Sequence, residues 1–387
     1  MFDFNPLCYD HIRNPYQNYD YLRDNHPVYW SNRLKGWVLT RQCDCLEVLK
    51  NAETFTRDKR KVGYLIDSQY DNLQIIEGEI KSTLHKKIVD GILSQNLENI
   101  CTKNIEYFSS IFSSKRDQGD INFVSEFSHP VSFKIASELL GISQSNWESF
   151  YPIFVGFTRG QDVALEPGRS RDAAEAHEKF SMFVEDWINK SNSGLIGYLK
   201  QHINSEFYMH PIVKNTIGAV FNASYSSLQS IMSESLLALK QQPSFLNEIN
   251  SNVKLTMAAN ELIRFVNPAQ GTARWALKDT NFRGVQIEAG TAVYTMLAAA
   301  NRDPDAFSEP NILTLDRNIR KKSGKQMSFG AGIHACVGSR LALCWAEQLL
   351  KFWVDHLEQI EITSEPTYMD TATFRNITKL PVNINKG

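Results

Sequence analysis

Long hydrophobic runs are absent from this sequence of 387 residues. No stretch of about 18 consecutive apolar residues occurs, which argues against a membrane-spanning helix. The first residues, MFDFNPLCYDHIRNPYQ, have neither the basic segment nor the apolar core of a secretory signal. We therefore expect a cytoplasmic protein without a membrane anchor.

An excess of charge of one sign is also missing. The 41 Lys and Arg residues against 43 Asp and Glu residues give a net charge of −2, so nothing global indicates nucleic-acid binding. The composition is 42% hydrophobic, 22% charged and 11% aromatic, which is ordinary for a folded protein and argues against disorder.

Cysteine is scarce. The six cysteines include no CxxC pair and stand at Cys8, Cys43, Cys45, Cys101, Cys336 and Cys344. This number and spacing exclude a disulfide framework and give no zinc or dithiol motif. We expect at most one or two of them to carry chemistry.

The hydrophobic pattern predicts a mainly α protein with small β-sheets. Residues 26–40 have the aromatic and β-branched pattern of a hairpin, and helical spacing dominates from about residue 42. Further helices are predicted at 176–190, 211–240 and 253–266, and strands at 283–288, 291–296 and 380–384. The length alone allows two or three domains at roughly 150 residues each. Since no repeat, low-complexity tract or linker interrupts the chain, we expect residues 1–387 to form a single domain.

Cys336 has the most informative surroundings of the six cysteines. It stands in FGAGIHACVG, residues 329–338, directly before an amphipathic segment of helical period. Glycines let such a loop turn tightly, and a helix N-terminus favours a thiolate by lowering the thiol pKa. One cysteine cannot hold zinc or an iron–sulfur cluster, but it can be the one protein ligand of haem iron. Taken alone, a lone cysteine is more often a small buried hydrophobe.

The ten-residue string resembles the haem-binding loop of the cytochrome P450 family, whose pattern is Phe-Gly-x-Gly-x-His-x-Cys-x-Gly. The segments NPYQNYDYLRDNHPVYW, GWVLTR, ETFTRD and EFSHPVSFKIASELLGI resemble further family segments in the right order. The likeness extends over residues 6–387. It implies an α-helical prism with haem b between a long distal helix and the helix after the cysteine loop. The residues that it implies around the haem are Cys336 as axial thiolate, His334 and Arg274 at the propionates, and Phe329, Gly330, Gly338 and Ala223.

Glu261 and Arg264 lie three residues apart in NELIRF, a spacing at which the side chains can pair on one helix face. Such pairs are commonplace on solvated helices. The resemblance, however, makes them part of a structural Glu-x-x-Arg motif, with Arg302 as the third member of the triad.

The distal helix departs from the family pattern. The resemblance aligns Ala223-Ser224-Tyr225-Ser226-Ser227 with a motif that normally ends in an acid and a threonine, which help to deliver protons. Ser226 replaces the acid and Ser227 the threonine, so Ser226 and Ser227 are the candidate catalytic residues. Neither can ionise near neutral pH. The alternative is that they are helix-interior serines bonded to carbonyls four residues earlier, and we expect the usual relay to be incomplete.

A second departure lies in KSTLHKKIVDGIL. The family usually has His-x-x-x-Arg here to support a propionate, and the aligned positions are Ser82 and Lys86. Lys86 can still pair with a carboxylate, although without bidentate geometry. His85 is one residue out of place and is expected at the surface or partly buried.

Five basic residues precede the cysteine loop. A run of charge is usually only a solvated face, but in this family an acidic electron donor docks on the surface over the thiolate, and positive charge there would steer it. The candidates are Arg317, Arg320, Lys321, Lys322 and Lys325.

The function implied is a bacterial-type monooxygenase that activates O2 with electrons from a ferredoxin or flavodoxin-type donor, and we expect it to be a monomer. The pocket implied, with Ala223, Pro268, Ala269, Phe374 and the loop at 60–78, predicts a small to medium, mostly apolar metabolite from a biosynthetic pathway. Two alternatives stay open. One is an atypical enzyme that uses peroxide or substrate-assisted proton delivery, or that catalyses coupling or desaturation. The other is a non-catalytic haem-thiolate sensor.

Overall fold

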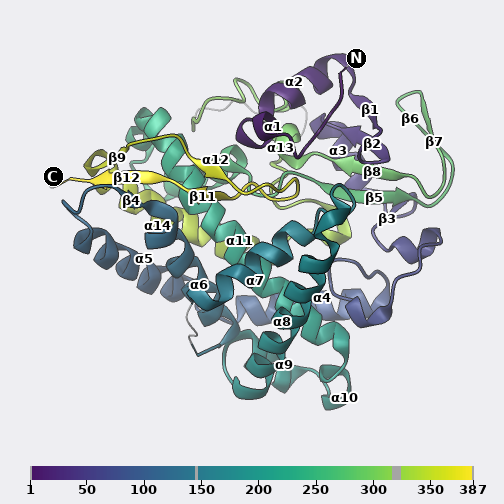
Figure 1. The fold of residues 1–387 in the computed structure, drawn as a ribbon, viewed down its shortest axis with the longest axis horizontal. Helices are drawn as coiled ribbons and strands as arrows, with labels where there is room; N and C mark the ends of the chain where they lie inside the picture. Colours follow the sequence, from purple (N-terminus) through teal and green to yellow (C-terminus); the bar gives the residue numbers. More distant parts are fainter. Residues whose placement is uncertain (1, 144–146, 316–323, 386–387) are drawn as a thin grey trace.

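A computed structural model describes residues 2–143, 147–315 and 324–385 of the chain. Helices form the body of the molecule (Figure 1). The main sheet lies at one side, beside the N-terminal helices, and a smaller sheet lies near the C-terminus. The mainly α character expected from the sequence is confirmed.

The α-helices are the main elements of the described part of the chain. Their bounds are α1 Tyr9–Arg13, α2 Tyr16–Asn25, α3 Gln42–Lys50, α4 Glu79–Leu93, α5 Leu97–Ser114, α6 His129–Leu140, α7 Trp147–Gly160, α8 Ser170–Lys190, α9 Gly194–His202, α10 Ser205–Tyr208, α11 Pro211–Gln241, α12 Asn252–Val266, α13 Leu297–Ala300 and α14 Ser339–His356. Shorter helical turns are η1 Lys59–Val62, η2 Ser68–Tyr70, η3 Val124–Ser128, η4 Pro167–Arg169, η5 Pro243–Glu248, η6 Gly332–His334 and η7 Leu357–Gln359.

The helix α11 runs through the middle of the helical body (Figure 1) and is buried on most of its circumference. A helix of this kind must be covered by other helices, and α11 packs against α6, α8, α12 and α14. Its first turn is fixed by Pro211 at N1 and by the His210 Nδ1 atom, which accepts the Ile212 N–H at 3.2 Å.

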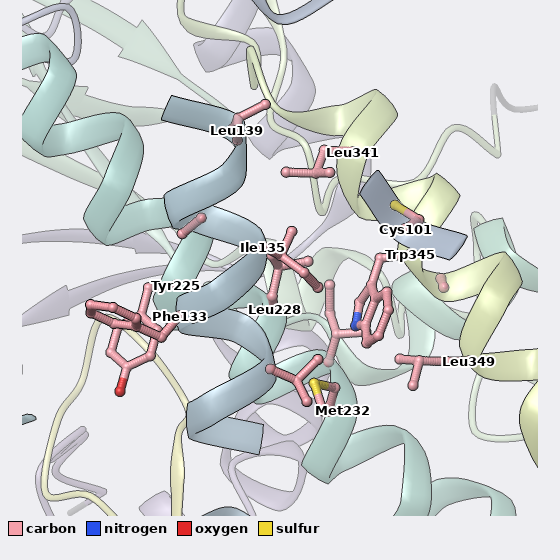
Figure 2. Close-up of a cluster of buried hydrophobic side chains, with 14 of the residues drawn as sticks. Cys101, Phe133, Ile135, Leu139, Tyr225, Leu228, Met232, Leu341, Trp345 and Leu349 are labelled. Atoms are coloured by element: carbon pink, nitrogen blue, oxygen red, sulfur yellow. The ribbon is translucent and has the colours of Figure 1, made fainter. Parts of the chain in front are cut away.

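The core around α11 is a continuous set of aliphatic and aromatic side chains. Figure 2 shows Leu228 and Met232 of α11 between Ile135 of α6 and Trp345 of α14, with Cys101 of α5 beside α14. Each of these side chains is almost completely buried. The close packing fixes α14, the helix that follows Cys336, relative to α11.

The main sheet has the strand order β1-β2-β8-β5-β3. Its strands are β1 Val28–Ser31, β2 Gly36–Leu39, β3 Phe55–Thr56, β5 Thr272–Ala276 and β8 Ala292–Thr295. The predicted hairpin at 26–40 is confirmed as the antiparallel pair β1–β2, and β2 pairs with β8 in parallel. Because β5 pairs with both β8 and β3, this sheet positions Arg274 beside the segment that follows β3.

Three small sheets complete the fold. They contain β4 Ile121–Asn122, β12 Pro381–Ile384 and β9 Ile360–Ile362 in one sheet, β10 Thr367–Tyr368 with β11 Ile377–Lys379 in the second, and β6 Thr280–Phe282 with β7 Val285–Ile287 in the third. The strands predicted at 283–288, 291–296 and 380–384 correspond to β7, β8 and β12, and the helices predicted at 176–190, 211–240 and 253–266 correspond to α8, α11 and α12.

Candidate functional site

A cavity of about 790 Å³ lies beside α11. Its walls come from one face of α11, the segment from Pro268 to Trp275, the loop before α4, the cysteine loop and the turn at Ala372–Phe374. Ala223, Pro268, Ala269 and Phe374, the predicted pocket residues, all line it. A space of this size, with mostly apolar walls, is typical of a small-molecule site.

The cysteine loop is closed by its own backbone. The Cys336 N–H donates to the Phe329 carbonyl at 2.9 Å, and the Gly330 N–H donates to the Met327 carbonyl at 2.8 Å. Gly332 has a φ of +72°, and a Cβ there would lie 2.1 Å from the Leu49 carbonyl oxygen, so only glycine fits. The loop therefore holds Cys336 directly before α14, with its side chain on the cavity wall.

Buried polar groups anchor the loop to the rest of the protein. Asn301 accepts the Met327 N–H at 2.6 Å and donates to Ser328 Oγ at 2.7 Å, while Ser328 Oγ donates to the Ile263 carbonyl at 3.0 Å. The position of the sulfur is thus tied to α12 and to the end of α13.

The sequence predicts a lowered pKa for the Cys336 thiol. This prediction is wrong when only the protein atoms around the thiol act on it. Although the side chain faces the cavity, many protein atoms surround it, and burial raises the pKa of the Cys336 thiol. The Gly338 N–H acts in the opposite direction but does not outweigh desolvation. Since a coordinated thiol is deprotonated outright by its metal, the sulfur needs a cation partner to be a thiolate.

Six cationic side chains line the same cavity. Arg60 and Lys214 pair with carboxylates and Lys59 lies over the Trp275 ring, which leaves Arg57, Lys81 and Arg274. Burial lowers the pKa of each, to about 10 for Arg57, about 8 for Lys81 and about 9 for Arg274, and the charge of Arg57 lowers the last two further. Within the described ranges, none of the three has a carboxylate within 4 Å. Lys81 Nζ donates only to the Leu73 carbonyl, at 3.3 Å, and Arg274 donates to Thr272 Oγ1 and the Ala273 carbonyl.

His334 adds a fourth basic group. Its Nε2 lies 3.4 Å from Glu77 Oε1, its Nδ1 is buried without a described partner, and burial lowers its pKa to about 4. Lys86, which the sequence predicts at the cofactor, is exposed and does not line the cavity. Lys81 is buried with Leu84, Ile88 and Ile92 on the inner face of α4, and five residues on a helix place Lys86 on another face.

These residues fit the haem expected from the sequence. Buried cations without counter-ions are costly unless an anion joins them, so Arg57, Lys81 and Arg274 suit the two carboxylates of a haem. Cys336 supplies a soft ligand on the same cavity, and Phe329, Gly330, Gly338 and Ala223 line it too. The residues that line the cavity therefore suit both the carboxylate groups and the iron of a haem.

The two candidate serines of α11 face in different directions. Ser227 lines the cavity and donates to the Ala223 carbonyl at 2.6 Å. Ser226 does not line it: its Oγ is completely buried and accepts from Asn376 Nδ2 at 3.1 Å. Ser226 thus faces away from the cavity, because one residue turns the side chain by about 100° around the helix, and its part in catalysis stays a prediction.

The turn between β10 and β11 closes one side of the cavity. Phe374 pairs with Ala269 in an antiparallel bridge. The same turn also contacts the segment after α7. Asp162 accepts the Ala372 N–H at 2.7 Å and the Thr373 hydroxyl at 2.9 Å. Arg169 forms an ion pair with Asp370 at 2.9 Å. This turn thus joins the segment after α12 to the segment after α7.

Glu261 and Arg264 form the predicted buried pair, with N–O distances of 2.7 and 2.8 Å. Arg264 also donates to the Asn301 and Pro310 carbonyls at 2.7 and 3.0 Å. Arg302 instead donates to Asn311 Oδ1 and the Phe265 carbonyl, and no ion pair joins it to Glu261 among the described residues. Two members of the triad expected from the sequence therefore form an ion pair. The third, Arg302, binds other residues nearby.

Of the residues predicted to form the electron-donor face, Lys325 is exposed, while Arg317, Arg320, Lys321 and Lys322 lie outside the described residues.

Sequence reasoning missed Arg57, Glu77 and Lys81. The apolar spacing of Leu84, Ile88 and Ile92 carries a signal for Lys81, because it places Lys81 on the buried side of the helix. Arg57 and Glu77 lie on loops, and nothing local in the sequence brings them near residue 334.

Comparisons with known proteins agree on one family. The family model described as "Cytochrome P450" matches residues 232–372. The chain is 25% identical to the "Biotin biosynthesis cytochrome P450" of Bacillus subtilis (strain 168) over 389 residues, covering 96% of both chains. It is 22% identical to the "Polyketide biosynthesis cytochrome P450 PksS" of the same strain, covering 99% of both. A crystal structure of epothilone D-bound cytochrome P450epoK superposes with a TM-score of 0.86, at 20% identity and 100% coverage of both chains. In the described part of the chain, no helix has the length and apolar character needed to cross a membrane.

Proposed function

Because the chain belongs to the cytochrome P450 family, we propose that it is a haem-thiolate monooxygenase whose iron ligand is Cys336. The observation that carries this assignment is one cavity that holds both the Cys336 side chain and three cations, Lys81 and Arg274 buried and Arg57 half-buried, whose side chains have no carboxylate partner among the described residues. The proposed reaction inserts one oxygen atom of O2 into a C–H bond of a metabolite. The other oxygen atom is reduced to water by two electrons from a donor protein and two protons.

The chain's residues divide the work of holding the cofactor. Cys336 binds the iron, Arg57, Lys81, Arg274 and His334 hold the haem carboxylates, and Gly330 and Gly338 allow the loop to approach the ring. When bound, haem supplies O2 activation and hydrogen abstraction, which the thiolate promotes by donating electron density. The apolar wall around Phe374 and Leu228 excludes water from the reacting end of the substrate.

Ser227 is one of the hydroxyl residues of α11 on the cavity wall, with Thr216 and Ser224, and it is the one proposed to hold a proton there. Its Oγ now donates to the Ala223 carbonyl, and rotation about χ1 would turn it toward a ligand. Among the described residues of α11 that line the cavity, the only ionisable one is Lys214, which pairs with Glu185 at 3.1 Å. Proton delivery therefore depends on Ser227 together with water or a substrate group.

The substrate proposed is a medium-sized, mostly apolar molecule from a biosynthetic pathway. The apolar walls support the first part, and the names of the relatives, which act in biotin and polyketide biosynthesis, support the second. We also propose a ferredoxin or flavodoxin-type electron donor that docks over the cysteine loop, where Lys325 is exposed. The monomeric state, the single domain over 1–387 and the cytoplasmic location stay predictions.

A second proposal is favoured by the missing acid on α11. An enzyme without that carboxyl group can use hydrogen peroxide in place of O2 and electrons, because peroxide brings its own protons. Comparing turnover with a ferredoxin system against turnover with peroxide separates the two proposals. The substrate for both assays comes from a metabolite library screened for ligands that shift the spin state of the haem iron.

Replacing Ser227 by alanine is expected to lower ferredoxin-driven turnover by on the order of 10²-fold, because it removes the hydroxyl that handles protons at the cavity. The measurement is the rate of product formation, together with the product formed per NADH consumed. Ser226→Ala is the matched control, since that side chain lies one residue away but outside the cavity. Equal rates of product formation in both variants would contradict the role given to Ser227.

A further inference from the structure

A carboxylate lies within the group of cations expected to hold the haem. Glu77 stands two residues before α4, and its side chain is only 5% exposed. Its Oε2 accepts from Thr56 Oγ1 at 2.8 Å and from Lys61 Nζ at 2.7 Å. Its Oε1 accepts the Arg57 N–H at 2.7 Å and lies 3.4 Å from His334 Nε2.

These contacts join three segments that are far apart in the sequence. Thr56 ends β3 and is followed by Arg57 and Lys61, Glu77 precedes α4, and His334 belongs to the cysteine loop. Burial by itself would raise the pKa of Glu77, but the hydrogen bonds from His334, Arg57, Lys61 and Thr56 hold it well below its usual range. Glu77 is therefore a permanent negative charge near neutral pH.

The charges that face Glu77 are almost all positive. Arg57 and Lys61 lie on the segment after β3, Lys81 on α4 and Arg274 on β5, while His334 on the cysteine loop faces Glu77 as a neutral imidazole near neutral pH. The charge of Glu77 acts on both Lys81 and Arg274, although neither forms an ion pair with it. Lys61 neutralises part of this charge from outside, with its side chain 46% exposed.

We infer that Glu77 is a positioning residue that fixes His334 against the segment after β3 and lowers the reduction potential of the haem iron through its charge. The inference rests on the proposed haem site. Reduction adds an electron to the iron, and a fixed negative charge in a low-dielectric interior opposes this addition. The cations Arg57, Lys81 and Arg274 act in the opposite direction, so Glu77 sets the balance of charge on that side of the cavity.

The test is the midpoint potential of the haem-loaded protein, measured by spectroelectrochemistry below the Lys81 pKa of about 8. Glu77→Gln keeps the size and the acceptor oxygen but removes the charge. It is expected to raise the potential by an amount equal to about a tenfold change in the ratio of oxidised to reduced protein, which is 59 mV for one electron. Glu79→Gln is the control, because Glu79 is exposed two residues away, and it should change the potential much less.

Lys61→Gln is the second variant and removes a positive charge from the same cluster. It is expected to lower the potential, and it remains informative if Glu77→Gln does not fold. Equal potentials in Glu77→Gln and Glu79→Gln, or a rise in Lys61→Gln, would overturn the inference. The proposed function fails separately, if the wild-type protein itself shows no thiolate-type spectrum with carbon monoxide.

Discussion

Replacing Arg264 by methionine is expected to lower the free energy of unfolding by about 3–5 kcal/mol, because it leaves the buried Glu261 carboxylate without its bidentate guanidinium. Arg264 is 2% exposed and also donates to the Asn301 and Pro310 carbonyls. Asn301 in turn anchors Met327 and Ser328 at the start of the cysteine loop. The loss should therefore appear both as lower stability and as weaker retention of haem.

Urea denaturation of Arg264→Met and of Lys190→Met measures this effect. Lys190 pairs with Asp186 on the surface of α8, with side chains 71% and 52% exposed, and an exposed pair is worth no more than about 0.5 kcal/mol. A difference between the two variants of less than about 1 kcal/mol would show that the Glu261–Arg264 pair does not hold the fold together.

Replacing Cys336 by alanine is expected to reduce monooxygenase turnover by at least about 10³-fold, equal to about 4 kcal/mol of barrier. The physical reason is that the thiolate is the electron-donating ligand, and no other cysteine lines the cavity among the described residues. The cations that hold the haem carboxylates stay in place, so some haem should still bind. Turnover and haem content after gel filtration measure the two effects separately.

Cys344→Ala is the matched control for that variant. Cys344 lies eight residues further on in α14, where its Sγ is 3.7 Å from the Leu97 carbonyl and does not face the cavity. It should keep near-normal turnover. Similar losses in both variants would point to damage to α14 and not to loss of a ligand.

The elements with strong local patterns could be predicted from the sequence. The hairpin at 26–40 carries aromatic and β-branched residues around a turn, and α11 is bounded by Pro211 at its start and Pro243 just after its end. Cys336 was also predictable as the candidate ligand, because the glycines that its loop requires are themselves visible in the sequence.

The rest of the site could not be predicted, because it depends on the directions of helix side chains and on contacts between distant segments. Ser226 and Lys86 were each assigned by alignment, yet helix rotation turns one toward Asn376 and the other toward solvent. Glu77 approaches His334 across 257 positions of the chain, and only the folded arrangement of three loops brings them together. Likewise, the thiol pKa direction was mispredicted because desolvation depends on atoms from distant segments.

The central claim is that Cys336 provides a thiolate to haem iron in this chain. The most direct measurement is the absorption spectrum of the reduced wild-type protein with carbon monoxide. The account predicts the strongly red-shifted Soret band of a thiolate-ligated haem, and predicts its loss in Cys336→Ala. A Soret band of the histidine-ligated type in the wild-type protein, or a red-shifted band that persists in Cys336→Ala, would contradict the claim.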